Sequence, residues 1–523
     1  MRTQDLPQQQ ATTDGGAGKV VGWLLLAPAA VLTVLTLVIP TVRTVATSLR
    51  DETFLGESEY VGFDNYGIVF GDERFWPSVG FALSLVAAPI VAAVVVAPLL
   101  AAAVNWAGGW ARVTARVVFS LALVVFSPVA LGIAWRSYLG AEDPAALANL
   151  VTTVATMRWV MLLTTFGVVC AVGLMLFLPV FRARDRRLWP TLFAVAGVAV
   201  PGLLAVGLQQ FTIPFTMTSF GPASRTMTPV GLLYDSAFRT LRAGVGAAVA
   251  VVLLCVLAVL GVAAVLVVIL TRLRVSLAPP APARGGAGAV VLAALVLVAV
   301  VAVAVLALLP WFEALSGSDP ESPGMQGRTW SAAALGALVS VGVGYLAALG
   351  VSGLRPLGRH SEWLLLPFAP WLFVGAAPLS IEFFKSLRDG GGLGTESALR
   401  QPILVSLIAM VVLAVVCRGQ SARQGPFLTT VVVPTLPVAG LLFVVTTFVN
   451  AQDLWWPLLV ASSPENFTTP VALSAAAGAF GPSVSVAAAT PLLAVVLGFL
   501  ALAALQVFHL DRLVATTGTE PSE

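Results

Sequence analysis

Charged side chains are scarce in this sequence. They make up 10% of the 523 residues, against about 25% in an ordinary soluble domain. Hydrophobic residues account for 58% of the chain, and its mean hydropathy is +0.96. A soluble protein this apolar could not cover its surface with polar groups, and a disordered chain has the opposite composition. The scarcity of charge therefore predicts a polytopic membrane protein.

Histidine and cysteine, the residues of many metal and catalytic sites, are rarer still. The two histidines, His360 and His509, lie far apart in expected loops, so we expect no histidine-based metal site or catalytic triad. Cys170, Cys255 and Cys417 each lie in or at the end of an apolar run, and no pair has disulfide or metal-motif spacing. We expect all three to be buried as small apolar side chains.

An excess of charge of one sign is also missing. The formal net charge is only +3, although 26 of the 28 basic residues are arginine. The sequence pI is about 9.0, a value that could point to nucleic acid, but the basic residues are scattered through the expected loops. We therefore expect membrane lipid, and not nucleic acid, around this chain.

Long continuous apolar runs are what the sequence has in abundance. A helix needs about 20 apolar residues to cross a bilayer core of about 30 Å, and these runs do not alternate as the strands of a membrane barrel do. We predict an all-α, polytopic membrane protein with about twelve transmembrane helices. The expected spans are 20–42, 79–104, 112–135, 159–181, 189–215, 243–271, 288–311, 330–353, 362–384, 401–417, 427–449 and 483–508.

A proline- and glycine-rich stretch divides these spans into two sets of six. Residues 276–288 have the sequence Ser-Leu-Ala-Pro-Pro-Ala-Pro-Ala-Arg-Gly-Gly-Ala-Gly, which is typical of a linker. We therefore expect a first six-helix half over 20–275 and a second over 289–515. Residues 1–19 and 516–523 are expected to be cytoplasmic tails, the first of them flexible.

Charge gives the expected orientation of the chain. With the N-terminus in the cytoplasm and alternating spans, the inside loops carry the excess of Arg and Lys, as the positive-inside rule requires. The short loop 182–187 is strongly basic, and the loop 51–74 is rich in Asp and Glu. We predict cytoplasmic termini, and the Arg-rich, Lys-poor, Ala- and Val-rich composition favours a bacterial plasma membrane.

Four motifs stand at particular points of this topology. Val61-Gly-Phe-Asp-Asn-Tyr66 follows the first span, and Ser127-Pro-Val-Ala-Leu-Gly-Ile-Ala-Trp135 ends the third. Phe211–Pro222 begins within the last turns of the fifth span, and Gln452-Asp-Leu-Trp-Trp-Pro-Leu458 follows the eleventh. In order and spacing they resemble the permease subunits of binding-protein-dependent ABC importers of the sugar type, the maltose and glycerol-phosphate class. Two different six-helix permeases of that family would here be fused in one chain.

The resemblance implies a function and a set of partners. The chain would be the transmembrane permease component of an importer for a carbohydrate or similar polar solute, which an extracellular solute-binding protein delivers. ATP would be bound by a cytoplasmic partner subunit, because this sequence has no glycine-rich phosphate loop followed by Lys-Ser/Thr. We therefore expect no enzymatic activity and no cofactor in the chain itself.

One feature of the family is absent from both halves. Its permeases carry a cytoplasmic Glu-Ala-Ala…Gly loop, whose short helix docks on the ATPase. Here 182–187 and 418–424 take its place, and six or seven residues make less than two helical turns. The candidate ATPase-facing residues are Arg182, Arg184, Arg186, Arg187, Arg418 and Arg423.

The missing loops leave alternatives open. One is an importer permease with an altered ATPase contact. Another is a degenerate permease, uncoupled from ATP hydrolysis, that acts as a membrane partner or receptor for a binding protein. An unrelated twelve-helix transporter is the third.

Polar side chains near the outer ends of the fifth and eleventh spans are candidates for the substrate path, because polar groups inside a bilayer are costly. Amides and carboxylates hydrogen-bond to hydroxyls, and aromatic rings cover the apolar face of a sugar. The alternative is a membrane interface, where such residues cost little. The candidates are Gln209, Gln210, Thr212, Thr216, Asn450, Gln452, Asp453 and Trp455. Glu382 and Lys385 are expected to form a local ion pair.

Overall fold

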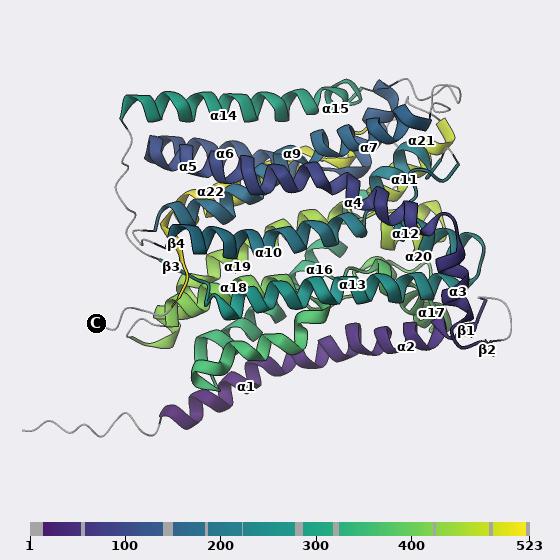
Figure 1. Ribbon diagram of the computed structural model, residues 1–523, viewed down its shortest axis with the longest axis horizontal. Coiled ribbons are helices and arrows are strands. Elements are labelled where there is room, and N and C mark those ends of the chain that lie inside the picture. Colours follow the sequence, from purple (N-terminus) through teal and green to yellow (C-terminus); the bar gives the residue numbers. More distant parts are fainter. Residues whose placement is uncertain are drawn as a thin grey trace, which may run out of the picture.

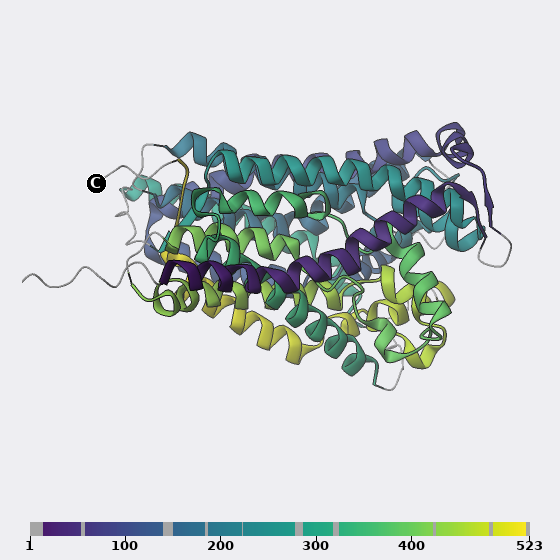
Figure 2. The same ribbon diagram turned by 90° about the horizontal axis from the view of Figure 1, so that it is seen from below.

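The computed structural model describes residues 14–53, 58–139, 150–183, 187–221, 223–277, 286–316, 324–421, 425–480 and 485–518. Helices dominate these residues, and their only strands form two short pairs. Figure 1 shows the long helices running side by side along the long axis of the molecule, and Figure 2 shows the same bundle from below. The prediction of an all-α, multi-pass membrane protein is confirmed at this level.

The bundle has two ends, which are distinguished by their strands. At one end lie β1 (Arg50–Asp51), β2 (Glu59–Tyr60) and α3 (Asp64–Gly71); we call it the α3 end. At the other lie β3 (Arg274–Leu277) and β4 (Leu513–Thr516); we call it the β3–β4 end.

The first half of the chain builds its helices in the order of the predicted spans. The letter η marks a π-helical or 3-10 segment. The elements are α1 (Asp14–Thr33), η1 (Val34–Val38), α2 (Ile39–Ser48), α4 (Phe75–Val91), η2 (Ala92–Val96), α5 (Ala97–Ala107), α6 (Gly109–Val124), α7 (Pro128–Tyr138), α9 (Leu150–Phe181), α10 (Leu188–Leu208), α11 (Thr212–Thr218), α12 (Pro229–Tyr234), η3 (Asp235–Arg239) and α13 (Ala243–Leu270).

The second half contains more 3-10 and short elements. They are α14 (Ala287–Ala307), α15 (Leu309–Glu313), α16 (Met325–Ala348), η4 (Leu349–Leu354), η5 (Gly358–Trp371), η6 (Ala377–Leu379), α17 (Ser380–Asp389), η7 (Glu396–Leu399), α18 (Leu407–Ser421), η8 (Leu428–Val432), α19 (Val433–Ala451), α20 (Trp455–Val460), η9 (Pro464–Asn466), α21 (Thr469–Phe480), η11 (Ala487–Ala489), α22 (Leu492–Phe508) and η12 (Leu510–Arg512).

Nine helices within the described ranges are long and apolar enough to cross a membrane, or ten if one bent pair counts as a span. The bent pair is α6 and α7, which replace the predicted span 112–135 and meet at 81°. The bend lies where Ser127 caps α7, accepting a hydrogen bond from Ala130 N, and Pro128 opens the new helix. The predicted span 112–135 is therefore present only as this bent pair.

The two remaining predicted spans are not full-length helices either. Over 362–384, a 3-10 helix containing Pro367 and Pro370 gives way to the separate helix α17. Proline has no N–H to donate and clashes with the preceding turn, so two prolines three residues apart disfavour a continuous α-helix here. The predicted span 401–417 shortens to α18, which begins at Leu407. The count of twelve complete spans is thus not reached in the described chain.

Each half of the chain ends in a similar succession of α-helices and a strand, apart from short π-helical and 3-10 segments between them. A long helix breaks into short helices and resumes as a long helix followed by a strand, as α10–α11–α12–α13–β3 and again as α19–α20–α21–α22–β4. The two final strands pair with each other in antiparallel register, Val275 opposite Ala515. The end of one half is thereby joined to the end of the other.

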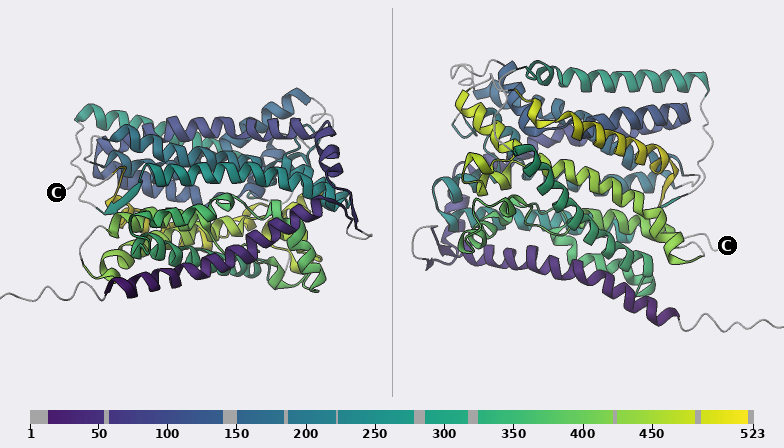
Figure 3. Two further views of the ribbon diagram at one scale, coloured as in Figure 1. Left: turned by 60° about the horizontal axis from the view of Figure 1, so that its bottom comes forward. Right: turned by 180° about the vertical axis from the view of Figure 1, so that it is seen from behind.

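The first helix of each half packs against the other half. Helix α1 lies along α16 and η4, whereas α14 lies against α5 and α9. Figure 1 shows these two helices on opposite edges of the bundle, and Figure 3 shows the same placement from behind. The halves are therefore interleaved in space although 276–288 separates them along the chain.

The cysteines differ from expectation at one position. Cys170 and Cys417 are buried as predicted, but Cys255 is exposed on α13. An apolar run does not reveal which face of a membrane helix meets lipid and which meets protein, so burial of Cys255 could not follow from its neighbours in sequence.

Candidate functional site

Gln209 holds the two halves together at a helix break. It follows α10 directly, and its Nε2 donates to the carbonyl oxygens of Ala205 at 3.0 Å and Phe373 at 2.8 Å. Its Oε1 accepts from Gly375 N at 2.9 Å. Phe373 and Gly375 lie in the irregular stretch between η5 and η6 of the second half. Both ends of the Gln209 amide are thus hydrogen-bonded to the second half, and we call this pair of contacts with Phe373 and Gly375 the Gln209 clamp.

Gln452 occupies the corresponding position at the end of α19 but bonds differently. Its buried Nε2 donates to Ala489 O at 2.9 Å, within its own half. The other candidates near α11 are engaged locally: Thr216 Oγ1 donates to Thr212 O at 2.8 Å, and Gln210 O accepts from Thr228 Oγ1 at 2.6 Å. Their backbone and hydroxyl groups therefore stabilise the broken helix.

Asp453 caps the short helix α20. Its Oδ1 accepts from Trp455 N at 3.1 Å, and its Oδ2 accepts from Trp456 N at 3.4 Å and from Gln401 Nε2 at 2.7 Å. Burial among protein groups raises the pKa of the Asp453 carboxyl, and these three hydrogen bonds oppose that rise. The side chain is a buried acid held in one orientation by its neighbours.

A small polar cavity lies beside Asp453. It is lined by Thr329, Gln401, Asn450, Asp453 and Thr468 among others, and it has roughly the size of one water molecule. Thr468 Oγ1 is buried there without a hydrogen-bond partner in the described part of the chain. The cavity suits an ordered water and is too small, in this arrangement, for a sugar.

An aromatic cluster joins the two predicted groups of candidates. Phe211 from the first half meets Trp455 from the second edge-to-face, with ring centroids 4.7 Å apart. Tyr234 and Phe238 lie 6.0 and 6.4 Å from the same indole. Trp455 Nε1 is buried and has no acceptor among the described residues. Because Phe211 follows Gln210 and Trp455 lies two residues after Asp453, the aromatic cluster forms the seam between both candidate groups.

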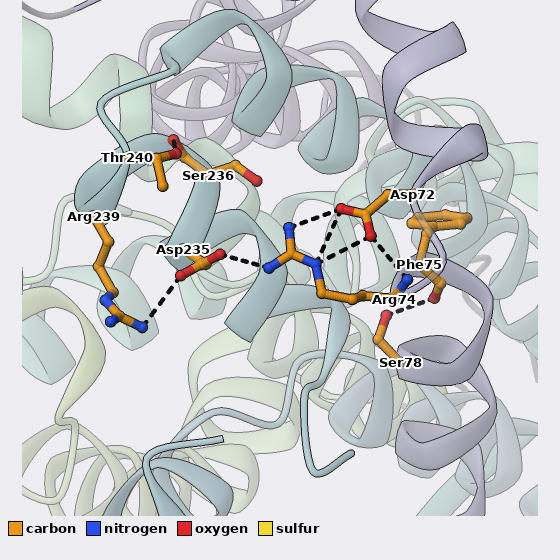
Figure 4. A network of polar contacts seen from close by, with 8 residues as sticks. All are labelled: Asp72, Arg74, Phe75, Ser78, Asp235, Ser236, Arg239 and Thr240. Carbon is orange, nitrogen blue, oxygen red and sulfur yellow. Dashed lines mark hydrogen bonds and ion pairs between the residues drawn. The ribbon is translucent and has the colours of Figure 1, made fainter. Parts of the chain in front are cut away.

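An ion-pair network fixes the segment that carries Tyr234 and Phe238. Arg74 Nη1 lies 2.8 Å from Asp235 Oδ2, and Arg74 Nη2 lies 2.8 Å from Asp72 Oδ2 (Figure 4). Arg239 pairs with the other oxygen of Asp235 at 3.2 Å. The Arg74 guanidinium holds the pKa of Asp72 below its usual value. The loop after α3 is thus connected to one wall of the aromatic cluster.

The predicted ion pair of Glu382 and Lys385 is confirmed, with 3.1 Å between Lys385 Nζ and Glu382 Oε1. It is not only local. Lys385 also lies 2.6 Å from Glu52, and Thr47 Oγ1 donates to Glu382 at 2.6 Å. The pair therefore ties α17 to the end of α2.

Three of the predicted ATPase-facing arginines are among the described residues, and all three lie at the β3–β4 end. Arg182 is 2% exposed, and its Nη1 lies 2.6 Å from Asp511 Oδ1; burial lowers the pKa of this guanidinium. Arg418 pairs with Glu362 at 3.4 Å, and Arg187 is exposed. Arg184, Arg186 and Arg423 lie outside the described residues.

Sequence reasoning missed several residues of this region. Gln401, Thr329 and Thr468 reach the cavity from separate elements, and no spacing in the sequence connects them with Asp453. Phe211 lies in a motif noted for its resemblance to the family, but its contact with Trp455, like that of Tyr234, depends on the packing of the two halves.

No family model matches the chain, and no curated protein matches it either. The resemblance to sugar-type permeases therefore rests on the sequence motifs.

Proposed function

We propose that this chain is the permease component of a binding-protein-dependent importer for a polar solute, with carbohydrate as the first substrate class to test. The observation that supports the proposal is the seam at which Phe211 meets Trp455. It brings into contact two aromatic rings that adjoin the two groups of polar candidates, one from a helix break in each half. Transporters built from repeats bind their substrates at broken helices between the repeats.

In this proposal the polar and the aromatic side chains around the seam contact different parts of the solute. Asn450, Gln452 and Asp453 exchange hydrogen bonds with solute hydroxyls, and Trp455 and Phe211 cover the apolar face of a ring. The path is closed in the present arrangement, because the neighbouring cavity holds about one water. Solute passage would require the Phe211–Trp455 contact to separate and the Gln209 clamp on Phe373 to release.

The partners in this proposal meet opposite ends of the bundle. An extracellular solute-binding protein would meet the acidic α3 end, and an ATP-binding subunit would meet the β3–β4 end. Arg182 and Arg418 form ion pairs with acids of the chain itself. Arg187 is exposed at this end and stays a candidate for the ATPase contact, together with Arg184, Arg186 and Arg423.

A second candidate function is supported by the connections at the β3–β4 end. Helix α9 ends at Phe181 and α10 begins at Leu188; α18 ends at Ser421 and η8 begins at Leu428. Such gaps are too short to project a docking helix. The β3–β4 ladder also ties the halves together there. These features favour a permease uncoupled from ATP hydrolysis that serves as a membrane partner of a binding protein.

The decisive experiment combines uptake with identification of partners. The double variant Gln452→Ala/Asp453→Asn should abolish uptake of the transported solute, tested first with labelled maltose, without lowering abundance in the membrane. Asp389→Asn, an exposed acid at the end of α17, is the matched control and should transport normally. Full uptake by the double variant would exclude these residues from the path.

Affinity purification from the native membrane separates the two candidate functions. A stoichiometric ATPase with solute-stimulated turnover supports the importer, and neutralising Arg184, Arg186 and Arg187 should then weaken its retention. A binding protein recovered without an ATPase supports the uncoupled scaffold.

A further inference from the structure

Three arginines converge on one aspartate at the β3–β4 end. Arg112 and Arg116 lie one turn apart on α6, and Arg182 follows α9. Their nitrogens lie 3.2, 3.7 and 2.6 Å from Asp511 Oδ1. The exposed fractions of Arg112, Arg116 and Arg182 are 9%, 0% and 2%. Three guanidinium groups are therefore buried around a single carboxylate, which comes from the end of the other half.

The charges and donors of this cluster do not balance. Three cations and one anion leave two positive charges in excess, and no second acid of the described chain lies within ion-pair distance of these arginines. Nε and Nη1 of Arg116, and Nε and Nη2 of Arg182, are buried without a hydrogen-bond acceptor among the described residues. Buried charge is costly unless it is paired and hydrogen-bonded. The cluster therefore lacks an anionic acceptor.

The arrangement fits the oxygens of a phosphate group. Guanidinium forks bind two phosphate oxygens at once, and several forks can share one phosphate. Helix α6 begins at this end, and Gly108 before it supplies no capping side chain. The free N–H groups and the helix dipole add positive potential. Side chains lean toward the N-terminus of their helix, so Arg112 and Arg116 reach toward the same end.

The cluster lies at a level where lipid headgroups are available. Trp106 and Trp110 flank the turn between α5 and α6 and are 46% and 52% exposed. Exposed tryptophans of this kind mark the membrane interface, and basic pockets between membrane helices bind anionic headgroups there. The side chain of Asp511 is 22% exposed, which gives an anion a way in beside it.

We propose that Arg112, Arg116 and Arg182 form a binding site for a phosphate-bearing anion, drawn either from an anionic lipid headgroup or from free phosphate. The bound phosphate accepts hydrogen bonds from the guanidinium N–H groups that Asp511 does not pair with. The site is separate from the seam at the α3 end and holds whether or not the chain imports a solute.

The test uses the full chain, purified in neutral detergent and stripped of lipid. Thermal unfolding is followed by tryptophan fluorescence while phosphatidylglycerol, phosphatidylcholine or inorganic phosphate is added, with sodium chloride at matched ionic strength as the blank. We expect phosphatidylglycerol, inorganic phosphate or both to raise the midpoint, and phosphatidylcholine and chloride to leave it unchanged. A shift with the lipid alone assigns the site to a headgroup, and a shift with phosphate alone assigns it to the free ion.

Substitutions separate recognition from a structural role. Arg112→Gln, at the edge of the cluster, should raise the half-saturating anion concentration about tenfold, as expected for loss of one charge-assisted contact. Arg512→Gln removes the same charge from an exposed neighbour of Asp511 and should leave it unchanged. Asp511→Asn should lower the midpoint without anion, yet show a larger anion-dependent rise than the unaltered chain.

Two results would overturn the proposal. One is an equal midpoint shift for the unaltered chain and Arg112→Gln. The other is an Asp511→Asn protein whose lost stability no phosphate-bearing probe restores, which would make the cluster an internal ion-pair network only.

Discussion

Single glycines decide how closely the elements of this protein approach one another. A Cβ on Gly419 of α18 would collide with the carbonyl oxygen of Val275 in β3, and a Cβ on Gly350 would meet the backbone of Gly22 in α1. Both contacts connect one half of the chain to the other. Small residues permit such backbone contact between membrane helices, so their placement determines whether the halves can interleave.

Gly419→Ala should destabilise the protein by about 1–3 kcal/mol, the usual cost of overpacking a close contact. Gly342→Ala is the matched control, because Gly342 is also helical and nothing lies within 4 Å of its added Cβ. The control should be neutral or stabilising by up to about 1 kcal/mol, since alanine favours the helix. Denaturant unfolding of both variants in detergent gives the comparison, and equal stability would refute the contact.

Asp453 shows how a polar candidate can be structural and chemical at once. It caps α20 with backbone hydrogen bonds from Trp455 and Trp456 and is met by Gln401. Burial raises its pKa in the folded protein. The folded state therefore binds this proton more tightly than the unfolded state, whose aspartates titrate near pH 3.9. Its contribution to stability falls as pH rises from the unfolded pKa through the folded one.

Asp453→Asn should remove this loss of stability with rising pH and keep the cap, because an amide oxygen still accepts from the backbone. Asp453→Ala should cost about 1–3 kcal/mol at every pH, since the N–H groups of α20 lose their acceptor. Unfolding midpoints from pH 4 to pH 8 measure both effects. A midpoint profile of Asp453→Asn identical to that of the unaltered chain would show that the carboxyl does not titrate differently on folding.

At the scale of elements, apolar length located most spans but not their interruptions. Nine predicted spans appear as helices able to cross a membrane. The run 362–384 does not, and its first part, which contains Pro367 and Pro370, is a 3-10 helix. The sequence shows where the prolines lie. It does not show which of them interrupts a helix, because membrane helices tolerate proline when neighbouring groups satisfy the freed carbonyls.

The β3–β4 ladder is the element-level feature that no local pattern predicted. Residues 276–288 were expected to be a linker and 516–523 a tail, but Ser276 and Thr516 belong to paired strands. Four-residue strands carry almost no periodicity. Their pairing joins residues more than two hundred positions apart, and only the folded bundle brings these together.

A cysteine pair tests this ladder directly. Val275→Cys with Ala515→Cys, in a Cys255→Ser background, should cross-link under mild oxidation, because directly paired strand residues lie within disulfide range. Mass spectrometry of the joined peptides identifies the bond. Arg274→Cys with Ala515→Cys, shifted by one position, is the control and should react more slowly. A cross-link that halts uptake would show that the two strands must part during transport, whereas absence of a cross-link would contradict the pairing.

At the scale of the whole molecule, the exchange of first helices sets the architecture. Helix α1 lies on the second half and α14 on the first, so neither half presents a complete surface alone. The proposed path lies at the same seam, where Phe211 and Trp455 meet. Sequence reasoning located both candidate groups near corresponding helix ends. It could not show that the Gln209 side chain would accept a hydrogen bond from Gly375 of the other half. Nor could it show that Gln401 would donate a hydrogen bond to Asp453.

Orientation in the membrane remains a prediction that labelling can test. Ser58 is exposed at the α3 end, and Arg187 is exposed at the β3–β4 end. Each is replaced by cysteine in a separate variant, Ser58→Cys and Arg187→Cys. A membrane-impermeant thiol reagent added to intact cells should label the first and spare the second, because the basic loops stay in the cytoplasm. Inverted vesicles serve as the control and should give the opposite labelling. Labelling of Arg187→Cys from outside would reverse the proposed topology.

The sequence by itself determined the class of this protein: apolar runs of membrane-spanning length admit helices, because a backbone in lipid must satisfy its own hydrogen bonds. It also placed polar candidates at two helix ends. Tertiary structure alone decided which spans bend or shorten, which half each first helix covers, and which polar groups meet. Those outcomes depend on contacts between segments far apart in the chain. The role of a glycine, an aromatic ring or a buried arginine follows from the residues that it contacts in the folded protein.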